Sequence, residues 1–345
     1  MSMSKKIRVG VNGAGRIGRA FIKESLKRPE IEVVAVNDLG DADNIAYLLK
    51  YDTVYGQSNF NVSVSEDKKT LIIDGQNVGF LSEKDPAQLP WEELEIDVVV
   101  ESTGVFTTYE KAEAHITAGA KKVVITAPEK SGEDNEKHAT VLMGINEDAL
   151  STCQISSNAS CTTNAGSPVI QILHEALGIE KALLNTVHGY TATQAIVDSP
   201  SAKDFRRGRA AAQNIIPATT GAAVATTRVI KELEGRFDGI AIRVPVVAGS
   251  IADITFISKK ETTVEEVNKI LSTASGEDRW KDIFSVTNEP IVSSDILGSK
   301  YGSIADLNFT RVVGGNLVKV LAWYDNEMGY THTLIKHVIE TGKHI

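Results

Sequence analysis

The stretch VNGAGRIGR at residues 11–19 determines the fold expected for the first part of the chain. It follows an apolar run at residues 7–11 that is typical of a β-strand. It also opens a segment, residues 16–26, whose apolar side chains recur at the spacing of one helix face. Another short apolar run follows at residues 33–36. Strand, helix and strand in this order predict a parallel, doubly wound sheet.

The glycines of this stretch, Gly13, Gly15 and Gly18, have the spacing GxGxxG. In dinucleotide-binding proteins such glycines permit a tight turn, close approach of the backbone to a pyrophosphate, and close packing of helix on strand. The helix that follows offers free N–H groups and the positive end of its dipole to phosphates. Asp38 ends the next predicted strand, about 20 residues after the motif, where a carboxylate can bind ribose hydroxyls and repel a 2′-phosphate. The pattern therefore predicts NAD, in preference to NADP.

The second part of the chain has a different pattern of predicted strands. Beyond about residue 165 the predicted strands become longer and alternate in polarity, at residues 240–246, 252–259 and 317–324. Residues 331–339 are expected to form an amphipathic helix that returns to the first domain. A chain of 345 residues usually needs more than one core. We therefore expect a Rossmann domain at residues 1–160, completed by residues 327–345, and an α+β domain with a mostly antiparallel sheet at residues 161–326.

Composition excludes several classes of protein. The formal charge of −9 argues against nucleic acid as the main partner. Only two cysteines occur, which does not suit a disulfide framework and fits a reducing cytoplasm. We expect no signal peptide, because the start of the chain is short and polar, and no membrane span. The chain shows no histidine and cysteine cluster with metal spacing, so we expect no metal.

Cys161 is the first candidate for covalent chemistry. It lies in the polar segment SNASCTTN, residues 157–164, before a helical pattern that ends near Gly178. A cysteine near the start of a helix is favoured as a thiolate by the helix dipole. His188 follows a short apolar strand and is a candidate base. By themselves these two residues also fit a structural cysteine and an ordinary hydrogen-bonded histidine, which is our interpretation of Cys153.

Residues 157–164 resemble the active-site signature of the glyceraldehyde-3-phosphate dehydrogenase family. Further segments match this family in order along essentially the whole chain, at residues 11–19, 101–106, 209–221 and 323–327. The resemblance implies a cytoplasmic, NAD-dependent oxidoreductase of glycolysis. It would oxidise glyceraldehyde 3-phosphate to 1,3-bisphosphoglycerate through a thiohemiacetal and a thioester on Cys161, with inorganic phosphate as the acyl acceptor. It also implies a homotetramer, in which residues 190–214 form a long loop that reaches a neighbouring subunit.

The resemblance assigns a role to each matching residue. Cys161 would be the nucleophile, His188 the base, and Asn326 the residue that fixes the nicotinamide carboxamide. The other residues implied to bind the cofactor are Gly13, Gly15, Arg16, Ile17, Gly18, Asp38, Lys84, Ser102, Thr103, Gly104 and Tyr330. Thr191 and Arg243 would hold the phosphate of the substrate. The residues implied to bind inorganic phosphate are Ser160, Thr162, Arg207, Thr220 and Gly221.

The chain departs from the family pattern at Ala14, Lys84, Ala165 and residues 245–250. Lys84 stands where an arginine often meets the adenine, and Ala165 replaces a second cysteine that is common in the family, so that cysteine is not needed for catalysis. Other functions also stay open. They are a sister dehydrogenase acting on erythrose 4-phosphate, an enzyme whose acyl acceptor is coenzyme A or water, and a non-enzymatic NAD-binding protein on the same fold.

Overall fold

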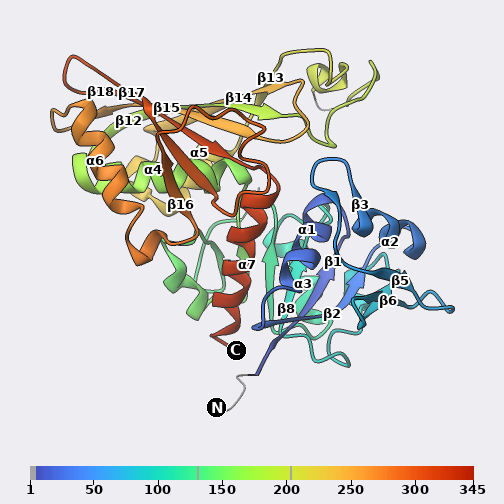
Figure 1. Cartoon of the computed structure of the whole chain (residues 1–345). Coiled ribbons are helices and arrows are strands. Elements are labelled where there is room, and N and C mark those ends of the chain that lie inside the picture. Colours follow the sequence, from blue (N-terminus) through green and yellow to red (C-terminus); the bar gives the residue numbers. More distant parts are fainter. Residues whose placement is uncertain (1–4, 130–131, 203) are drawn as a thin grey trace. The chain divides into compact units, whose positions relative to one another are not determined.

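The computed structural model describes residues 5–129, 132–202 and 204–345 (Figure 1). Contacts divide the chain into two compact units. Unit 1 comprises residues 1–159 and 334–345, and unit 2 comprises residues 160–333. The sequence prediction set the return of the chain at residue 327. The contact division falls later because only the last part of helix α7, Met328–Gly342, packs into the core of unit 1.

Unit 1 is built on a nine-stranded sheet with the order β10-β11-β9-β8-β1-β2-β7-β6-β5. Its strands are β1 Ile7–Asn12, β2 Ile31–Asn37, β5 Val62–Val64, β6 Thr70–Ile73, β7 Gln76–Leu81, β8 Val98–Glu101, β9 Lys122–Ile125, β10 His138–Thr140 and β11 Ile155–Ser157. Neighbouring strands are parallel from β10 to β7 and antiparallel from β7 to β5. The other elements are α1 Arg16–Ser25, α2 Ala42–Lys50, α3 Tyr109–Thr117, the hairpin β3 Tyr51–Asp52 and β4 Gly56–Gln57, and 3-10 turns at Pro86–Gln88 and Glu147–Ser151.

The sheet of unit 1 is buried on both faces. Along β8, Val98 and Val100 belong to one core cluster, whereas Val99 belongs to another. Because successive side chains of a strand point to opposite faces, these clusters lie on opposite sides of the sheet. The first cluster also contains Leu334 and Val338 of α7. This is the doubly wound α/β architecture that the sequence predicted, closed by the C-terminal helix.

Unit 2 is built on a seven-stranded sheet with the order β13-β14-β12-β15-β18-β17-β16. Its strands are β12 Ile179–Gly189, β13 Ile216–Thr219, β14 Phe237–Val244, β15 Ser250–Ser258, β16 Phe284–Thr287, β17 Ser303–Val313 and β18 Leu317–Tyr324. Among the described strands of this sheet, only β12–β14 and β16–β17 pair in parallel, so the sheet is mostly antiparallel, as predicted. Its helices are α4 Cys161–Leu177, α5 Ala222–Val229 and α6 Val264–Ala274, with 3-10 turns at Phe205–Gly208, Lys231–Leu233 and Asp278–Trp280.

Helices cover one face of this sheet. Figure 1 shows α4 and α5 on the same side of it, and α4 contacts β12, β15, β17 and β18. The burial of β12 alternates accordingly: Ala182 and Leu184 are buried, whereas Leu183 between them is 65% exposed. Ile240 and Leu317 are also exposed. Register places Leu183 beside Asp238 and Leu317 beside Ile257, so the uncovered face carries large apolar side chains.

Most strand predictions agree with the structure, and the differences have local causes. β18 spans the predicted residues. α4 ends with Gly178 as its C-cap, as predicted, and the φ of 68° at this position is one that glycine adopts without strain. β14 was predicted at residues 240–246 but ends at Val244, because Pro245 has no N–H to donate to a ladder. None of the described helices combines the length and the apolar character needed to cross a membrane.

Candidate active site

The glycine loop of unit 1 connects β1 to α1. Gly13 has a φ of 99°, and a Cβ at this position would lie 2.7 Å from the backbone nitrogen of Thr103. A Cβ at Gly18 would lie 2.0 Å from the carbonyl oxygen of Gly13. Both positions therefore require glycine. At Gly15, in contrast, no described atom lies within 4 Å of a Cβ, so a ligand could approach the backbone closely there.

The start of α1 suits an anion. Gly15 is the N-cap and contributes no capping side chain, and the first turn of this ten-residue helix contains no acidic residue. Its first N–H groups and the helix dipole therefore favour a phosphate. Arg16 is held to one side, because its Nη1 donates to Asp52 Oδ2 at 2.6 Å. Ile17 packs against the core cluster, so we expect both residues to contribute to the cofactor site through their backbone.

Asp38 follows β2 and reaches back to the glycine loop. Its Oδ2 accepts the backbone N–H of Ala14 at 2.6 Å, and its Oδ1 accepts that of Gly40 at 2.8 Å. A carboxylate can accept about four hydrogen bonds, so ribose hydroxyls could still bind. The residues present therefore fit a dinucleotide, with a negative charge beside the loop.

A second turn, residues 102–104 after β8, lies against the glycine loop. The Oγ of Ser102 donates to the carbonyl oxygen of Gly13 at 2.6 Å, and its backbone N–H donates to that of Asn12 at 2.8 Å. Gly104 has a φ of 73°, which glycine adopts without strain. The structure therefore places the predicted residues 102–104 beside the glycine loop. Lys84 is exposed in the segment after β7.

We expect the Asp38→Ala variant to relax the preference for NAD over NADP by at least about tenfold, because it removes the charge that would repel a 2′-phosphate. The measurement is the ratio of kcat/KM for the two cofactors. Asp38→Asn is the matched control for the hydrogen bonds, since it removes the charge but keeps one acceptor for Ala14 or Gly40. An unchanged ratio in both variants would refute the assignment of Asp38.

The residues predicted for chemistry meet in unit 2. Cys161 is the first residue of α4, and the N-cap Ser160 accepts the N–H of Thr163 at 3.0 Å. His188 lies near the end of β12 and is only 2% exposed. Its Nε2 lies 3.4 Å from Cys161 Sγ. The structure thus places the predicted nucleophile at a helix N-terminus and within reach of the predicted base.

Burial sets the charge state of this pair. It raises the pKa of the Cys161 thiol, and the positive charge of Arg243 and hydrogen bonds from Thr162 oppose this rise without cancelling it. Burial also lowers the pKa of His188 to about 3, with a smaller effect of Arg243 in the same direction. Both shifts favour a thiol beside a neutral imidazole near neutral pH. The predicted helix position is observed, and burial works against the thiolate that this position favours.

The other ring nitrogen of His188 has two close neighbours. Nδ1 lies 2.6 Å from the carbonyl oxygen of Gly189 and 2.6 Å from Nη1 of Arg243. A carbonyl only accepts and a guanidinium only donates, so Nδ1 can serve one of them at a time. When Nδ1 carries the proton and donates to Gly189, Nε2 presents its lone pair to Cys161. That tautomer can take a proton from the thiol.

Arg243 has donors to spare for an anion. Its Nη1 also donates to the carbonyl oxygen of Gly189 at 3.1 Å. Its Nε is buried without a hydrogen-bond partner among the residues that the structure describes. A buried donor without a partner is costly, and an arginine fork is well suited to phosphate oxygens. This part of the site therefore fits an anionic ligand next to Cys161 and His188.

A second group of polar side chains lies on the segment after β12. Thr191 Oγ1 and Thr193 Oγ1 are 2.9 Å apart, and Arg207 Nη1 donates to Thr193 Oγ1 at 3.1 Å. Arg207 Nη2 donates to the carbonyl oxygen of Thr219 at 3.2 Å. Thr191 and Arg207, predicted for different phosphates, thus share Thr193 as a neighbour. Sequence reasoning missed Thr193. Its position between the predicted residues Thr191 and Arg207 was the only feature of the sequence that pointed to it.

Two further predicted phosphate ligands, Thr220 and Gly221, precede α5. Thr220 Oγ1 accepts the N–H of Ala222 at 3.2 Å, and Gly221 caps the helix without a side chain. Thr162 differs from the prediction in one respect. Its hydroxyl bonds with the hydroxyl of Tyr324 at 2.9 Å, so we expect it to offer its backbone N–H, not its side chain, to a ligand.

Tyr324 is a residue that sequence reasoning did not single out. Its hydroxyl bonds with those of Thr162 at 2.9 Å and Thr186 at 2.7 Å, and its ring meets the ring of His188 edge-on with centroids 5.8 Å apart. Burial raises the pKa of Tyr324 far above its ordinary value, so it stays a neutral phenol. Tyr324 therefore joins α4, β12 and β18 next to His188. Its only signal was its place beside Asn326 in a segment that resembles the family.

Asn326 follows β18 and is held in one orientation. Its Oδ1 accepts the N–H of Gly249 at 3.0 Å and the hydroxyl of Ser250 at 3.2 Å. This leaves the amide hydrogens of Nδ2 as donors, which suits the carbonyl oxygen of a carboxamide. Tyr330 is buried in α7.

Cys153 behaves as a structural residue: it packs with Val141 and Leu150, and burial raises the pKa of its thiol.

His337 of α7 is a buried histidine behind the segment that leads to Cys161. Its Nε2 lies 2.8 Å from Ser156 Oγ, and its Nδ1 lies 3.0 Å from Asn158 Oδ1. Burial lowers the pKa of His337 to about 3, so it is neutral in the folded protein at any mildly acidic pH. In the unfolded chain it would take up a proton below about pH 6.5. Folding is therefore penalised by this residue as the pH falls.

When the pH is lowered from about 7.5 to about 5, we expect the free energy of unfolding to fall by about 2 kcal/mol less in the His337→Gln variant than in the wild-type protein. Glutamine can bond with Ser156 and Asn158 but does not titrate. The measurement is urea unfolding at both pH values, with the exposed His344→Gln as control. An identical pH dependence of stability in wild type and His337→Gln would show that the buried imidazole does not contribute.

Comparison with known proteins places this site in a family. The family model of the NAD binding domain of glyceraldehyde 3-phosphate dehydrogenase matches residues 7–109, and that of its C-terminal domain matches residues 160–326. The glyceraldehyde-3-phosphate dehydrogenase of Thermotoga maritima is 51% identical over 331 residues, which cover 95% of this chain and 97% of that protein. The chain belongs to the glyceraldehyde-3-phosphate dehydrogenase family. It is therefore an NAD-dependent oxidoreductase, and the predictions of family, fold class and cofactor are confirmed.

Other glyceraldehyde-3-phosphate dehydrogenases are similarly close. That of Geobacillus stearothermophilus is 48% identical over 331 residues, covering 95% of this chain and 96% of the relative. That of Streptomyces coelicolor is 47% identical over 342 residues, covering 98% of this chain and 99% of the relative. The C-terminal family model begins at Ser160 and ends at Asn326, so it includes Cys161 and His188. The NAD-binding model includes the glycine loop, Asp38 and residues 102–104.

Proposed function

We propose that this member of the family oxidises glyceraldehyde 3-phosphate to 1,3-bisphosphoglycerate, with NAD as hydride acceptor and inorganic phosphate as acyl acceptor. The observation that carries the proposal is the distance of 3.4 Å between Cys161 Sγ and His188 Nε2, with the donors of Arg243 beside them. A nucleophile in contact with a base, next to an unsatisfied cationic donor, suits covalent chemistry on an anionic aldehyde.

The first step forms a bond between Cys161 Sγ and the aldehyde carbon, while His188 Nε2 takes the thiol proton and returns it to the new hydroxyl. The backbone N–H of Cys161, which is the first of α4, and the ring of His188 can stabilise the developing oxyanion. One such donor typically lowers the barrier by about 3–4 kcal/mol. The product of this step is a thiohemiacetal on Cys161.

The second step removes a hydride from the thiohemiacetal carbon, and bound NAD supplies the acceptor for it. His188 Nε2 takes the proton of the hydroxyl in the same step, which leaves a thioester. An oxygen of inorganic phosphate then attacks the thioester carbon and the sulfur leaves, giving an acyl phosphate and free Cys161. We expect Ser160, Arg207 and the N-terminus of α5 with Thr220 and Gly221 to hold the attacking phosphate.

Substrate binding also bears on the base. If Arg243 binds the phosphate of the substrate, with Thr191 as a further ligand, its Nη1 gives up its contact with His188 Nδ1 at 2.6 Å. Nδ1 can then donate to Gly189, and Nε2 keeps its lone pair for Cys161. In this proposal the anion that marks the correct substrate also favours the tautomer that acts as base.

The deciding experiment mixes the purified protein with NAD and glyceraldehyde 3-phosphate and follows the absorbance of NADH with and without inorganic phosphate. We expect sustained turnover only with phosphate, and a single stoichiometric burst without it. Turnover that is indifferent to phosphate would indicate a hydrolytic enzyme. Activity restricted to erythrose 4-phosphate, or no NADH with either aldehyde, would favour the sister dehydrogenase or the non-enzymatic protein.

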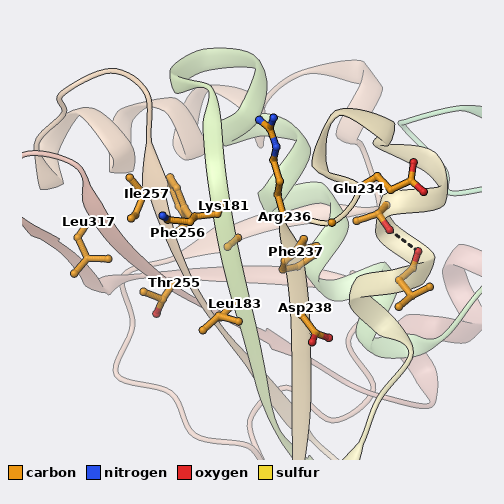
Figure 2. A pocket seen from close by; sticks show the side chains of 14 residues that line it. Lys181, Leu183, Glu234, Arg236, Phe237, Asp238, Thr255, Phe256, Ile257 and Leu317 are labelled. Atoms are coloured by element: carbon orange, nitrogen blue, oxygen red, sulfur yellow. Dashed lines mark hydrogen bonds between the residues drawn. The ribbon is translucent and has the colours of Figure 1, made fainter.

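We infer further that the protein is a homotetramer. Support comes from the uncovered apolar face of the unit 2 sheet, where a groove of about 840 Å³ is lined by Leu183, Ile257 and Leu317 among others (Figure 2). The segment after β12 also exposes apolar side chains, with Ile196 89% exposed and Phe205 85% exposed. Exposed apolar surface of this extent is typical of a protein interface. Its mass in solution, measured by light scattering, tests this assembly.

We propose the cytoplasm as its location and small molecules as its partners. Both cysteines are free thiols, which suits a reducing compartment. The net charge of −9 does not suit binding to nucleic acid. Detection of the protein in the cytosolic fraction of cells would test the location.

A further inference from the structure

A buried carboxylate in unit 1 joins the parts of the predicted nucleotide site. Glu101 is the last residue of β8 and is only 2% exposed. Its Oε2 accepts Nδ2 of Asn12 at 2.6 Å and lies 2.9 Å from Nε2 of His115. Its Oε1 accepts the backbone N–H of Thr103 at 2.8 Å and also the hydroxyl of Thr103. All four neighbours can act as donors, so this position suits a carboxylate, which only accepts.

The histidine beside this carboxylate is held in one tautomer. The indole nitrogen of Trp91 lies 3.1 Å from Nδ1 of His115. An indole N–H can only donate, so Nδ1 accepts and the ring proton is on Nε2, which faces Glu101. Trp91 and His115 are both fully buried. The contact between His115 and Glu101 is therefore a hydrogen bond from a neutral imidazole, with its direction fixed by Trp91.

The bonds of Glu101 extend to the ends of neighbouring strands. Asn12 ends β1 and precedes Gly13, and its Oδ1 accepts Nδ2 of Asn37 at the end of β2, at 2.7 Å. Asn37 in turn bonds with the backbone of Glu83 through both of its side-chain polar atoms, at 2.8 Å each. The carboxyl ends of β1, β2 and β8, where a doubly wound sheet binds its ligand, are thus linked through two buried side chains, Glu101 and Asn12.

Glu101 also fixes the turn after β8. The Thr103 hydroxyl that donates to Glu101 accepts the N–H of Val105 at 3.0 Å, so the exposed turn is folded over the carboxylate. The same turn lies directly on Gly13, where a Cβ would be 2.7 Å from the Thr103 nitrogen. A shift of Thr103 would therefore move the backbone atoms against which Gly13 and the glycine loop pack.

We propose that Glu101 is a positioning residue of the NAD site. It touches no ligand in this scheme, but its carboxylate holds Asn12 and Thr103, and with them the glycine loop and residues 102–105, in the shape that binds the dinucleotide. His115 and Trp91 hold Glu101 in turn. The proposal rests on the cofactor-binding residues of the proposed function.

The test is the affinity for NAD of the Glu101→Gln variant. Glutamine has nearly the same shape, but its NH₂ group must face two donors on one side or the other, so the two bonds accepted by that oxygen are lost in either orientation. We expect the Kd and KM for NAD to rise at least about tenfold, while kcat at saturating NAD and the KM for glyceraldehyde 3-phosphate change less than about threefold, as for other residues that orient a binding group.

Asp97→Asn is the matched control. Asp97 is also buried, at the other end of β8, where it accepts the N–H of Arg8 at 3.0 Å and Nζ of Lys121 at 2.7 Å. We expect it to lower the Tm but to leave the Kd for NAD within about twofold, because it lies away from the glycine loop. If Glu101→Gln lowers the Tm in the same way and leaves the Kd unchanged, Glu101 is merely structural and the proposal is wrong.

A second pair of variants keeps the proposal testable if Glu101→Gln does not fold. Thr103→Ser keeps the hydroxyl on Glu101 and should retain NAD affinity, whereas Thr103→Val should lower it. Where all variants fold, the effects of Glu101→Gln and Thr103→Val should be clearly less than additive, because both disturb the same hydrogen-bond network around Glu101. Equal affinity of both Thr103 variants would overturn the role of Glu101. Failure of the wild-type protein to bind NAD would instead contradict the proposed function.

Discussion

The Cys161→Ser variant is expected to lose at least about 10⁴-fold in turnover of glyceraldehyde 3-phosphate, the size of effect that follows removal of a covalent nucleophile. Serine fits the same position at the start of α4 and can still be approached by His188, but its hydroxyl ionises far less readily than a thiol and gives an ester in place of a thioester. The measurement is steady-state NADH formation at saturating aldehyde and phosphate.

Two observations separate this loss from damage to the fold. The glycine loop, Asp38 and residues 102–104 all belong to unit 1, whereas Cys161 belongs to unit 2, so NAD binding by the variant should match that of the wild type. Cys153→Ser is the control for a cysteine outside the site, since Cys153 is buried in unit 1 among Val141 and Leu150. We expect it to reduce stability and to keep turnover. Turnover by Cys161→Ser at the wild-type rate would contradict the thioester route.

The fold was largely predictable because its signals are local. The doubly wound unit follows from short apolar runs separated by glycine turns, and the glycines at positions 13 and 18 occupy places where a Cβ would meet backbone atoms. The end of the chain was harder. Helix α7 starts in unit 2 and reaches the core of unit 1 only from Leu334 onward, and periodicity alone does not show which core an apolar stripe will join.

The candidate site was predictable in part, and the missing part has a physical reason. Cys161 and Asp38 stand in motifs, and the motif fixes both the residue and its place at the end of an element. Tyr324, Thr193 and Glu101 each contact a residue at least 14 positions away, as in the bond of Tyr324 to Thr162, of Thr193 to Arg207 or of Glu101 to His115. Such contacts depend on sheet order and register, which no short segment encodes.

The charge state of the proposed catalytic pair, Cys161 and His188, could not be predicted from the sequence either. A helix N-terminus favours a thiolate, and that position was predicted correctly. How far the thiol is desolvated depends on everything packed around it, including β12, β18 and Tyr324. Burial raises the pKa of Cys161 and lowers that of His188 to about 3, and both shifts favour an uncharged pair. From that state the thiol must give up its proton as it attacks, which requires a base.

This state of the pair predicts a large effect for His188→Asn. The pKa of His188 is about 3, so its ring is neutral at any pH above about 4. It can therefore accept a proton throughout the physiological pH range. Asparagine cannot accept the thiol proton or the hydroxyl proton, so we expect turnover to fall by about 10²- to 10⁴-fold, the usual contribution of a positioned base. The measurement is kcat with saturating NAD, aldehyde and phosphate.

The same variant tests the resting state itself through the pH dependence of thiol alkylation. In the wild type the rate should rise with pH as Cys161 loses its proton, since a raised pKa leaves the thiol mostly protonated near neutral pH. In His188→Asn the profile should stay close to that of the wild type, because a neutral imidazole adds no positive charge that would stabilise the thiolate, whereas a shift to higher pH would indicate a thiolate–imidazolium pair. The exposed His344→Asn should leave both rate and profile unchanged. Alkylation of the wild type that is already maximal and flat near pH 6 would contradict the uncharged pair, and turnover by His188→Asn within about tenfold of the wild type would contradict the role of His188 as base.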